Sequence, residues 1–219
     1  MEDILLHGLG TTGKLLLAEI FADIRYAVRA IVCDDKYYQE NSYLGKPIYK
    51  TSEIEKFFTP NSIRVISTGV YSSMRERYAS YLQLKNKGYN FINYISKDAI
   101  VANDIIIGEN NIVFAGTYLD YFGKMGNCNI IRPNTYVGHN FDIHNGVYIA
   151  PNCSIAGYTT IEDLSFIGIG ATIIEHRNIK TETLIGAASL VTKDTEPFSQ
   201  YIGIPAAKIK SHKQTGILL

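Results

Sequence analysis

His139 is the side chain in this sequence that is best suited to proton chemistry. Histidine exchanges a proton near neutral pH, so it can act as a general base toward an amine or a hydroxyl. His139 stands two positions after Val137, an aliphatic residue of a regular pattern. This position predicts an outward-pointing side chain at a corner of the fold. An ordinary surface histidine would fit the same position.

A second stretch has the residue types that bind phosphate. The loop Gly8-Leu9-Gly10-Thr11-Thr12-Gly13 follows a short apolar strand at residues 4–6 and opens a segment with helical spacing. In that context, backbone amides and a helix N-terminus hold a diphosphate. Asp34 comes 21 residues after Gly13, near the spacing of the ribose-binding acid in dinucleotide folds. A tight turn with a solvated acid is the plain alternative.

A period of six residues governs the second half of the chain. All seventeen positions in steps of six from Ile95 to Val191 hold Ile, Leu, Val or Met. This period fits neither an α-helix nor an isolated strand, but it is typical of a hexapeptide β-solenoid. We therefore expect a three-sided coil of 18 residues per turn, with turns stacked about 4.8 Å apart. Glycine often follows the inward aliphatic, and a small residue often stands four positions after it; we expect these residues to ease the turns and fit the corners.

Residues 1–93 alternate strands and helices, which predicts a small parallel α/β sheet. We expect strands near residues 4–6, 29–33 and 64–67. A helix is expected over 14–24 and another over 73–87, ended by Gly88. Residues 48–58 are expected to include a short helix with Thr51 or Ser52 as its N-cap. The predicted domains are 1–93, 94–193 and a tail at 194–219 that leaves the repeat from Thr192.

Composition excludes several classes of function. The 219-residue chain has a formal net charge of zero, so nothing favours a nucleic-acid groove or an anionic membrane surface. There is no apolar run long enough for a membrane span and no signal peptide, and we expect a cytoplasmic protein. Cys33, Cys128 and Cys153 are too far apart for a metal motif and are expected to be buried filler.

With these features together, the chain resembles the left-handed β-helix acyltransferases. It is most similar to the bacterial nucleotide-amino-sugar N-acetyltransferases, grouped with the sialic-acid O-acetyltransferase family. Four segments carry the resemblance: the strand and glycine loop at residues 4–13, residues 31–35, the Val137-Gly138-His139 stretch with residues 149–157, and the tail Tyr201-Ile202-Gly203-Ile204-Pro205-Ala206-Ala207-Lys208. It implies a Rossmann-like N-terminal domain that binds a nucleotide sugar, a left-handed parallel β-helix, a homotrimer, and acetyl-CoA bound between neighbouring prisms.

The resemblance also implies roles for residues of the β-helix. His139 matches the general base, while Asn140 stands where relatives often have a glutamate that raises the basicity of the imidazole. Asp142 is considered as a substitute partner. The acetyl-CoA positions map onto Tyr148, Gly157, Ile169 and Ala187, with the Gly157 N–H as a donor to the acetyl carbonyl. Three lysines are weaker candidates for the CoA phosphates: Lys193, Lys208 and Lys210.

The nucleotide sugar is expected in the N-terminal domain. The predicted contacts are Gly8, Gly10, Thr11, Gly13, Asp34, Asp35 and Gly69. His7, which precedes the loop, is expected to be structural, and His176 and His212 are expected at the surface. No metal is expected.

Alternatives remain open at this point. The acceptor could be a sugar hydroxyl instead of an amine. The glycine loop permits an NAD-dependent oxidoreductase, although 93 residues hold only half of a full dinucleotide fold. His139 and His144 have the spacing of the zinc ligands in γ-class carbonic anhydrases, but Asn103 stands where a third histidine is needed. A non-catalytic solenoid is the fourth alternative.

Overall fold

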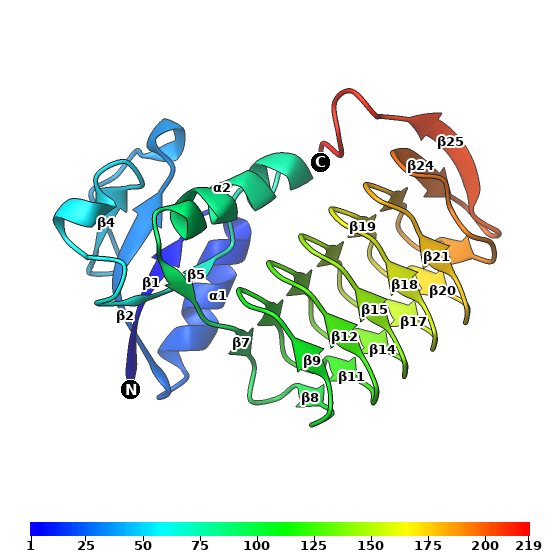
Figure 1. Ribbon diagram of the computed structural model, residues 1–219, viewed down its shortest axis with the longest axis horizontal. Helices are drawn as coiled ribbons and strands as arrows, with labels where there is room; N and C mark the ends of the chain where they lie inside the picture. Colours follow the sequence, from blue (N-terminus) through cyan, green and yellow to red (C-terminus); the bar gives the residue numbers. More distant parts are fainter. The chain divides into compact units, whose positions relative to one another are not determined.

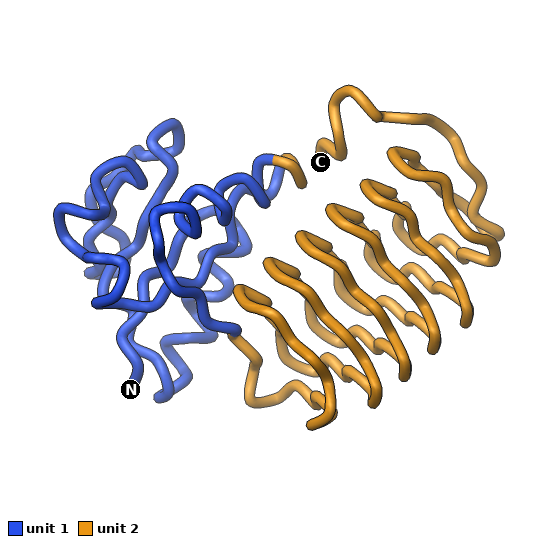
Figure 2. Tube along the Cα trace, viewed as in Figure 1, with its two compact units in different colours: residues 1–72, 76–93 blue, residues 73–75, 94–219 orange.

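The computed structural model describes residues 1–219, which form two compact units (Figure 2). Unit 1 consists of Met1–Ser72 and Glu76–Asn93, and unit 2 consists of Ser73–Arg75 and Tyr94–Leu219. Neither of the two α-helices has the length and apolar character needed to cross a bilayer.

Unit 1 is built on a six-stranded sheet with the order β3-β4-β2-β1-β5-β6 (Figure 1). All neighbouring strands are parallel except the β3–β4 pair. Ile4, Ile31 and Ile66 are fully buried in its core. Its elements are β1 Glu2–His7, α1 Thr11–Phe21, β2 Tyr26–Cys33, η1 Asp35–Tyr37, β3 Ser42–Tyr43, β4 Lys46–Lys50, η2 Ile54–Lys56, β5 Arg64–Ser67, most of α2 Met74–Asn86, and β6 Asn90–Phe91.

The helix expected within residues 48–58 is reduced to the single 3₁₀ turn η2. Ile48 is buried in β4, where it pairs with Ile31 of β2. The start of the 48–58 segment is therefore a strand of the sheet and cannot be helical. Neither expected cap acts on the turn. The Thr51 hydroxyl donates to Asp34 and the Ser52 hydroxyl donates to Asp35.

Unit 2 contains seventeen two-residue parallel strands, as the six-residue period predicts. Each strand pairs with the strand three places further along, which is one coil later, as in Ile112↔Ile130. The strands are β7 Tyr94–Ile95, β8 Ile100–Val101, β9 Ile106–Ile107, β10 Ile112–Val113, β11 Tyr118–Leu119, β12 Lys124–Met125, β13 Ile130–Ile131, β14 Tyr136–Val137, β15 Asp142–Ile143, β16 Tyr148–Ile149, β17 Ser154–Ile155, β18 Thr160–Ile161, β19 Phe166–Ile167, β20 Thr172–Ile173, β21 Asn178–Ile179, β22 Leu184–Ile185 and β23 Leu190–Val191.

These strands make three faces, which we name by a central strand. The β14 face holds β8, β11, β14, β17, β20 and β23; the β15 face holds β9, β12, β15, β18 and β21; the β16 face holds β7, β10, β13, β16, β19 and β22. Three corners join them. The His139 corner joins the β14 and β15 faces, the Asn145 corner joins the β15 and β16 faces, and the Ala187 corner joins the β16 and β14 faces.

The interior of unit 2 is filled by the second residue of each strand. Val113, Val137 and Ile155 have no exposed surface, and the inward residues from Leu119 to Val191 form one continuous apolar cluster. The small residues four positions further on are also buried, including Thr117, Thr183 and Ser189. Both expectations for the repeat are therefore confirmed.

The glycines of the repeat have a different role from the one expected. The left-handed backbone conformation falls three residues after the inward aliphatic, for example at Asn140, Asn152 and Leu164 with φ of 55°, 58° and 58°. Glycine directly after the aliphatic is required by close approach instead. A Cβ on Gly168 would lie 2.7 Å from the Ala187 nitrogen and from the Ile185 oxygen of the next coil.

The segment after Thr192 stays with the coil for one more strand. β24 (Ser199–Ile202) pairs in parallel with β22 at the end of the β16 face, and β25 (Ala207–Ser211) then pairs antiparallel with β24. The tail therefore covers the last edge of this face with a hairpin, where the sequence predicted a departure from the repeat. An antiparallel final strand stops the parallel stacking and protects the edge from further pairing.

Gly168 and Gly170 separate the two reasons for a glycine in the repeat, which are close approach between coils and a left-handed backbone conformation. Gly168→Ala forces a methyl group against backbone atoms, so we expect a loss of about 3 kcal/mol in the free energy of unfolding. Gly170→Ala meets nothing within 4 Å but has φ of 67°, so we expect a loss of about 1 kcal/mol. Urea unfolding of both variants measures the difference, and equal losses would contradict the close-approach explanation.

Candidate functional site

His139 is exposed at the corner between β14 and β15, as its position in the repeat predicts. Its Nδ1 lies 2.9 Å from Oδ1 of Asn140. Because an amide oxygen only accepts hydrogen bonds, Nδ1 carries the hydrogen in this arrangement. In the neutral ring, Nε2 then has a free lone pair, which is the state that a general base requires.

Asn140 occupies a backbone position that suits asparagine. Its φ of 55° lies in the left-handed region, where asparagine is among the most tolerated residues after glycine. The Asn140 N–H donates to the carbonyl of Tyr121 on the preceding coil at 2.9 Å. The asparagine therefore both closes the corner and orients the imidazole.

Gly157 lies under the imidazole on the next coil. A Cβ at this position would lie 2.9 Å from Cε1 and 3.0 Å from Nε2 of His139. Only glycine therefore leaves room for the observed ring position. The Gly157 N–H donates no hydrogen bond within the chain, so it is available to an acceptor beside Nε2.

Two aromatic rings continue the His139 corner, and sequence reasoning did not identify their role. The Tyr158 ring is perpendicular to His139 at a centroid distance of 5.1 Å and parallel to His176 at 4.7 Å. Tyr158 and His176 are separated in the sequence by one coil of the repeat. That spacing was the available signal, because residues one coil apart stack along the axis.

Ile169 and Ala187 are exposed on the Ala187 corner, which the β14 face separates from His139. Their N–H groups also donate no hydrogen bond within the chain. At the Asn145 corner the equivalent amides are occupied: the N–H groups of Glu109, Asn127 and Asn145 donate to side-chain oxygens of the next coil. The His139 and Ala187 corners therefore each present backbone N–H groups without an acceptor in the chain, whereas at the Asn145 corner these three N–H groups are hydrogen-bonded.

Tyr148 lies away from the other predicted acetyl-CoA contacts. It is on the β16 face, opposite the His139 corner, and its ring stacks on Phe166 at 5.2 Å with an interplanar angle of 8°. Its side chain is also buried. The structure therefore does not bring Tyr148 together with His139, and its assignment stays a prediction without geometric support.

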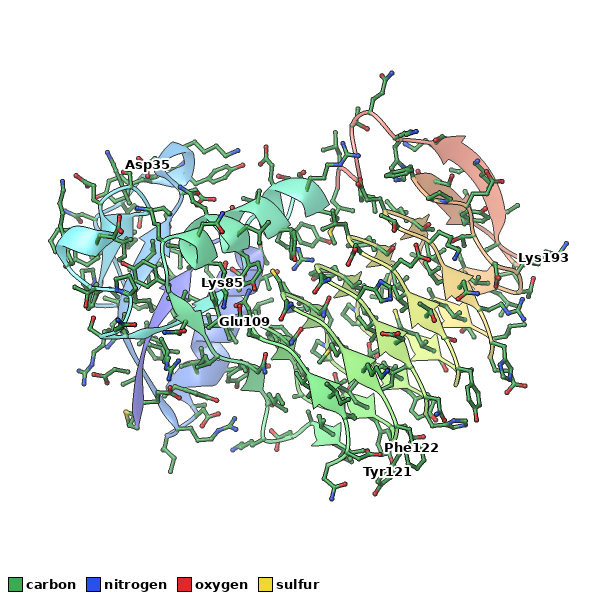
Figure 3. The ribbon with its side chains drawn as sticks, viewed as in Figure 1. Asp35, Lys85, Glu109, Tyr121, Phe122 and Lys193 are labelled. Carbon is green, nitrogen blue, oxygen red and sulfur yellow. The ribbon has the colours of Figure 1, made fainter.

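Lys193, which is labelled in Figure 3, follows β23 of the β14 face and so occupies the same corner as His139 at a later coil. Lys208 is paired with Glu196 at 2.6 Å, and Lys210 is exposed on β25. Asp142 is paired with His144 at 3.9 Å and makes no hydrogen bond to His139. His139 and His144 occupy different corners, and no group of three or more His, Cys, Asp or Glu side chains is placed to hold a metal ion.

A cavity of about 450 Å³ lies within unit 1. Five of the residues predicted to bind the nucleotide sugar line it: Gly8, Gly10, Thr11, Asp34 and Gly69. Further side chains that the sequence reasoning missed also line it, and they come mainly from η1, the loop that follows it, β3 and the segment after β5. These are Tyr37, Gln39, Glu40, Tyr43 and Tyr71, together with Lys14 on α1.

Gly13 and Asp35 do not line the cavity. A Cβ on Gly13 would lie 2.1 Å from the Gly8 oxygen, so this glycine allows α1 to pack against the end of β1. Asp35 is exposed and accepts hydrogen bonds from the backbone N–H and the hydroxyl of Ser52. Both residues support the shape of the site instead of facing it.

His7 has a structural role, as expected, but it also lines the cavity. Its Nε2 lies 3.0 Å from Asp34 and its Nδ1 lies 2.8 Å from the Ser67 hydroxyl, which ties together the ends of β1, β2 and β5. Burial alone would raise the pKa of Asp34, but the hydrogen bond and charge of His7 and the hydroxyls of Ser80 and Thr51 lower it to about 2.

The three cysteines are buried, as expected, and are free thiols. Burial raises the pKa of the Cys153 thiol to about 11. A thiol in this state is a poor nucleophile at neutral pH. Cys153 is therefore core filler.

The Asp34 network generates a prediction about stability and pH. The carboxylate has a lower pKa folded than unfolded, so its contribution is present above about pH 4 and is lost as the pH falls toward 2. We expect Asp34→Asn to lower the free energy of unfolding by about 2 kcal/mol at pH 7. The difference from wild type should shrink in urea titrations below pH 4. The exposed Asp35→Asn is the control, with a smaller effect, and a difference for Asp34→Asn that is independent of pH would contradict the assignment.

Comparison with known proteins identifies the fold. No family model matches the sequence, and no curated protein matches it. Among solved structures, the acetyltransferase domain of PglB from Neisseria gonorrhoeae FA1090 is similar over 95% of this chain and 100% of that chain, with a TM-score of 0.85 and 23% identity. PerB from Caulobacter crescentus, in complex with CoA and GDP-perosamine, is similar over 96% and 98%, with a TM-score of 0.83 and 23% identity. WeeI from Acinetobacter baumannii AYE is similar over 95% of this chain and 100% of that chain, with a TM-score of 0.81 and 19% identity. The chain therefore has the fold of the left-handed β-helix acetyltransferases.

Proposed function

We propose that this chain is an acetyl-CoA-dependent N-acetyltransferase that acts on the amino group of a nucleotide-linked amino sugar. One observation carries the proposal. His139 is held by Asn140 with Nδ1 as the donor, and its Nε2 lies over Gly157, whose amide has no acceptor in the chain. A base and a hydrogen-bond donor on one side of a corner suit acyl transfer.

The residues have distinct roles in the transfer. The amine of the acceptor attacks the thioester carbonyl while Nε2 of His139 takes the proton from the nitrogen. The Gly157 N–H stabilises the charge that develops on the carbonyl oxygen. The new C–N bond forms, the C–S bond breaks, and the thiolate leaves with the proton that His139 returns. No covalent enzyme intermediate is required.

The two corners with open amides fit the pantetheine arm, whose amide carbonyls need donors. His139 and Gly157 lie at one corner and Ile169 and Ala187 at another, with the β14 face between them. A single chain cannot bring these corners together. A second copy that presents its Ala187 corner to the His139 corner would complete the groove, and this supports a homotrimer as the working form.

The cavity of unit 1 fits a nucleoside diphosphate. Gly10 and Thr11 begin α1, where unpaired backbone N–H groups favour an anion. Lys14 adds a positive charge to this wall, where its Nζ lies 5.2 Å from the centroid of the Tyr43 ring, and the side chain of Tyr37 supplies a further aromatic ring for contact with a base. PerB, a structural neighbour, is known in complex with GDP-perosamine, which supports a nucleotide-linked amino sugar as the acceptor.

Thiol release from acetyl-CoA, measured against UDP-, dTDP- and GDP-linked amino sugars, tests the proposed function. We expect turnover with at least one amino sugar and none with its 4-hydroxy or 3-hydroxy counterpart. Turnover on the hydroxyl sugar alone would favour the O-acetyltransferase alternative. We expect His139→Gln to lower kcat/KM by about 10²- to 10⁴-fold, because glutamine cannot take a proton. Full activity of this variant would contradict His139 as the base.

Gly157→Ala tests the geometry of the base. The added methyl group displaces the imidazole, and we expect kcat/KM to fall by about 100-fold, as for other small misplacements. The melting temperature should also fall, because the methyl group would lie 3.0 Å from the His139 carbonyl oxygen as well, so kcat/KM is measured well below the melting temperature of the variant. Gly45→Ala, in the turn between β3 and β4, where an added Cβ meets nothing within 4 Å, is the control. Retention of wild-type activity in Gly157→Ala would show that the observed ring position is not the working one.

A further inference from the structure

His139 has an aromatic partner where a charged one would be expected. Its Nδ1 bonds to the neutral amide of Asn140, and no carboxylate contacts the imidazole. A neutral amide orients the ring but does not compensate the positive charge that the ring gains with a proton. Tyr158 is the other side chain in ring contact with His139.

The arrangement of the three rings follows from the coil. His139 is on one coil, Tyr158 on the next, and His176 on the one after. One face of Tyr158 is covered by His176, at 4.7 Å and 6°. The His139 ring is perpendicular to the Tyr158 ring at 89°, with the ring centroids 5.1 Å apart.

We propose that Tyr158 is a positioning residue for the base, and that its ring face stabilises the imidazolium form of His139. This inference rests on the proposed role of His139 as the proton acceptor. The face of an aromatic ring carries negative electrostatic potential, and a cation beside it is stabilised. His176 holds the Tyr158 ring in the plane that this contact needs. The stack thus supplies the charge compensation that Asn140 does not.

The titratable and charged groups around His139 are few. On β15, which follows the His139 corner, Asp142 pairs with His144. On the preceding coil, Tyr121 occupies the equivalent position, and Asp120 beside it accepts a hydrogen bond from the Tyr136 hydroxyl at 3.3 Å. On the following coils the neighbours are Tyr158, then His176 and Glu175. Tyr158 contacts both histidine rings, so it is the aromatic side chain next to His139 when the imidazole gains a proton.

NMR titration of the histidine ring protons tests the proposal directly and needs no substrate. The His139 signal is assigned by its loss in His139→Gln. We expect its titration midpoint to fall by about 0.5 pH unit in Tyr158→Leu, because the imidazolium loses its ring partner. Leucine is tolerated at this backbone position, since Leu164 has the same left-handed conformation, with φ of 58°, in the equivalent place.

Two variants separate the ring from other effects. Tyr158→Phe keeps the ring face without the hydroxyl, and we expect the midpoint to stay close to that of wild type. Tyr136→Leu removes an exposed tyrosine of the same coil that packs on Tyr118 instead of His139, and it should also leave the midpoint unchanged. An unchanged or raised midpoint in Tyr158→Leu would overturn the proposal. So would a fall in Tyr158→Phe equal to that in Tyr158→Leu, because the hydroxyl would then be responsible.

The same variants give a kinetic readout if the proposed function holds. The pH below which kcat/KM declines should move to lower pH in Tyr158→Leu together with the NMR midpoint. A moved NMR midpoint with no turnover on any amino sugar would count against the proposed function and leave the ring contact in place. An unmoved midpoint with normal turnover would count against the ring contact alone.

Discussion

The stacking of each coil directly on the one before it is the constraint on which unit 2 depends. Each strand hydrogen-bonds to its equivalent on the next coil, and each face of the unit grows by one strand per coil. The aliphatic interior, the buried small residues and the glycines without room for a Cβ all follow from this stacking. Any side chain that enters the gap between coils must displace backbone atoms.

The same constraint builds the site. Residues one coil apart lie directly over one another, so His139, Gly157 and Tyr158 come together without any loop insertion. The His139 ring sits above a glycine because a side chain there would occupy the position of the ring. At the Asn145 corner, side-chain oxygens satisfy the equivalent amides, which leaves the other two corners to offer donors to a ligand.

Much of unit 2 could be predicted from the sequence because its contacts are periodic. The strands, the inward residues and the place of His139 at a corner all follow from counting in sixes. The role of the glycines could not be predicted, since close approach and left-handed turns both favour glycine and only the backbone geometry separates them. Tyr148 shows a related limit. Its role as an acetyl-CoA contact was assigned from the resemblance alone, and its strand lies on the face opposite the His139 corner.

Unit 1 was less predictable because its site depends on contacts between distant residues. His7 reaches Asp34, 27 residues away, and Ser67, 60 residues away. No local sequence pattern predicts hydrogen bonds between residues so far apart. The glycine loop was visible from its strand-loop-helix context. Tyr37, Tyr43 and Tyr71 come from the short elements η1 and β3 and from the segment after β5, which show no repeating pattern in the sequence.

The central claim is that acyl transfer takes place at the His139 corner, in a groove completed by a second copy. A crystal structure with CoA tests it most directly. We expect the thiol sulfur beside Nε2 of His139 and the Gly157 amide, with the pantetheine amides bonded to the N–H groups of Ile169 and Ala187 from a neighbouring chain. CoA bound away from His139, or held entirely by one chain, would contradict the account.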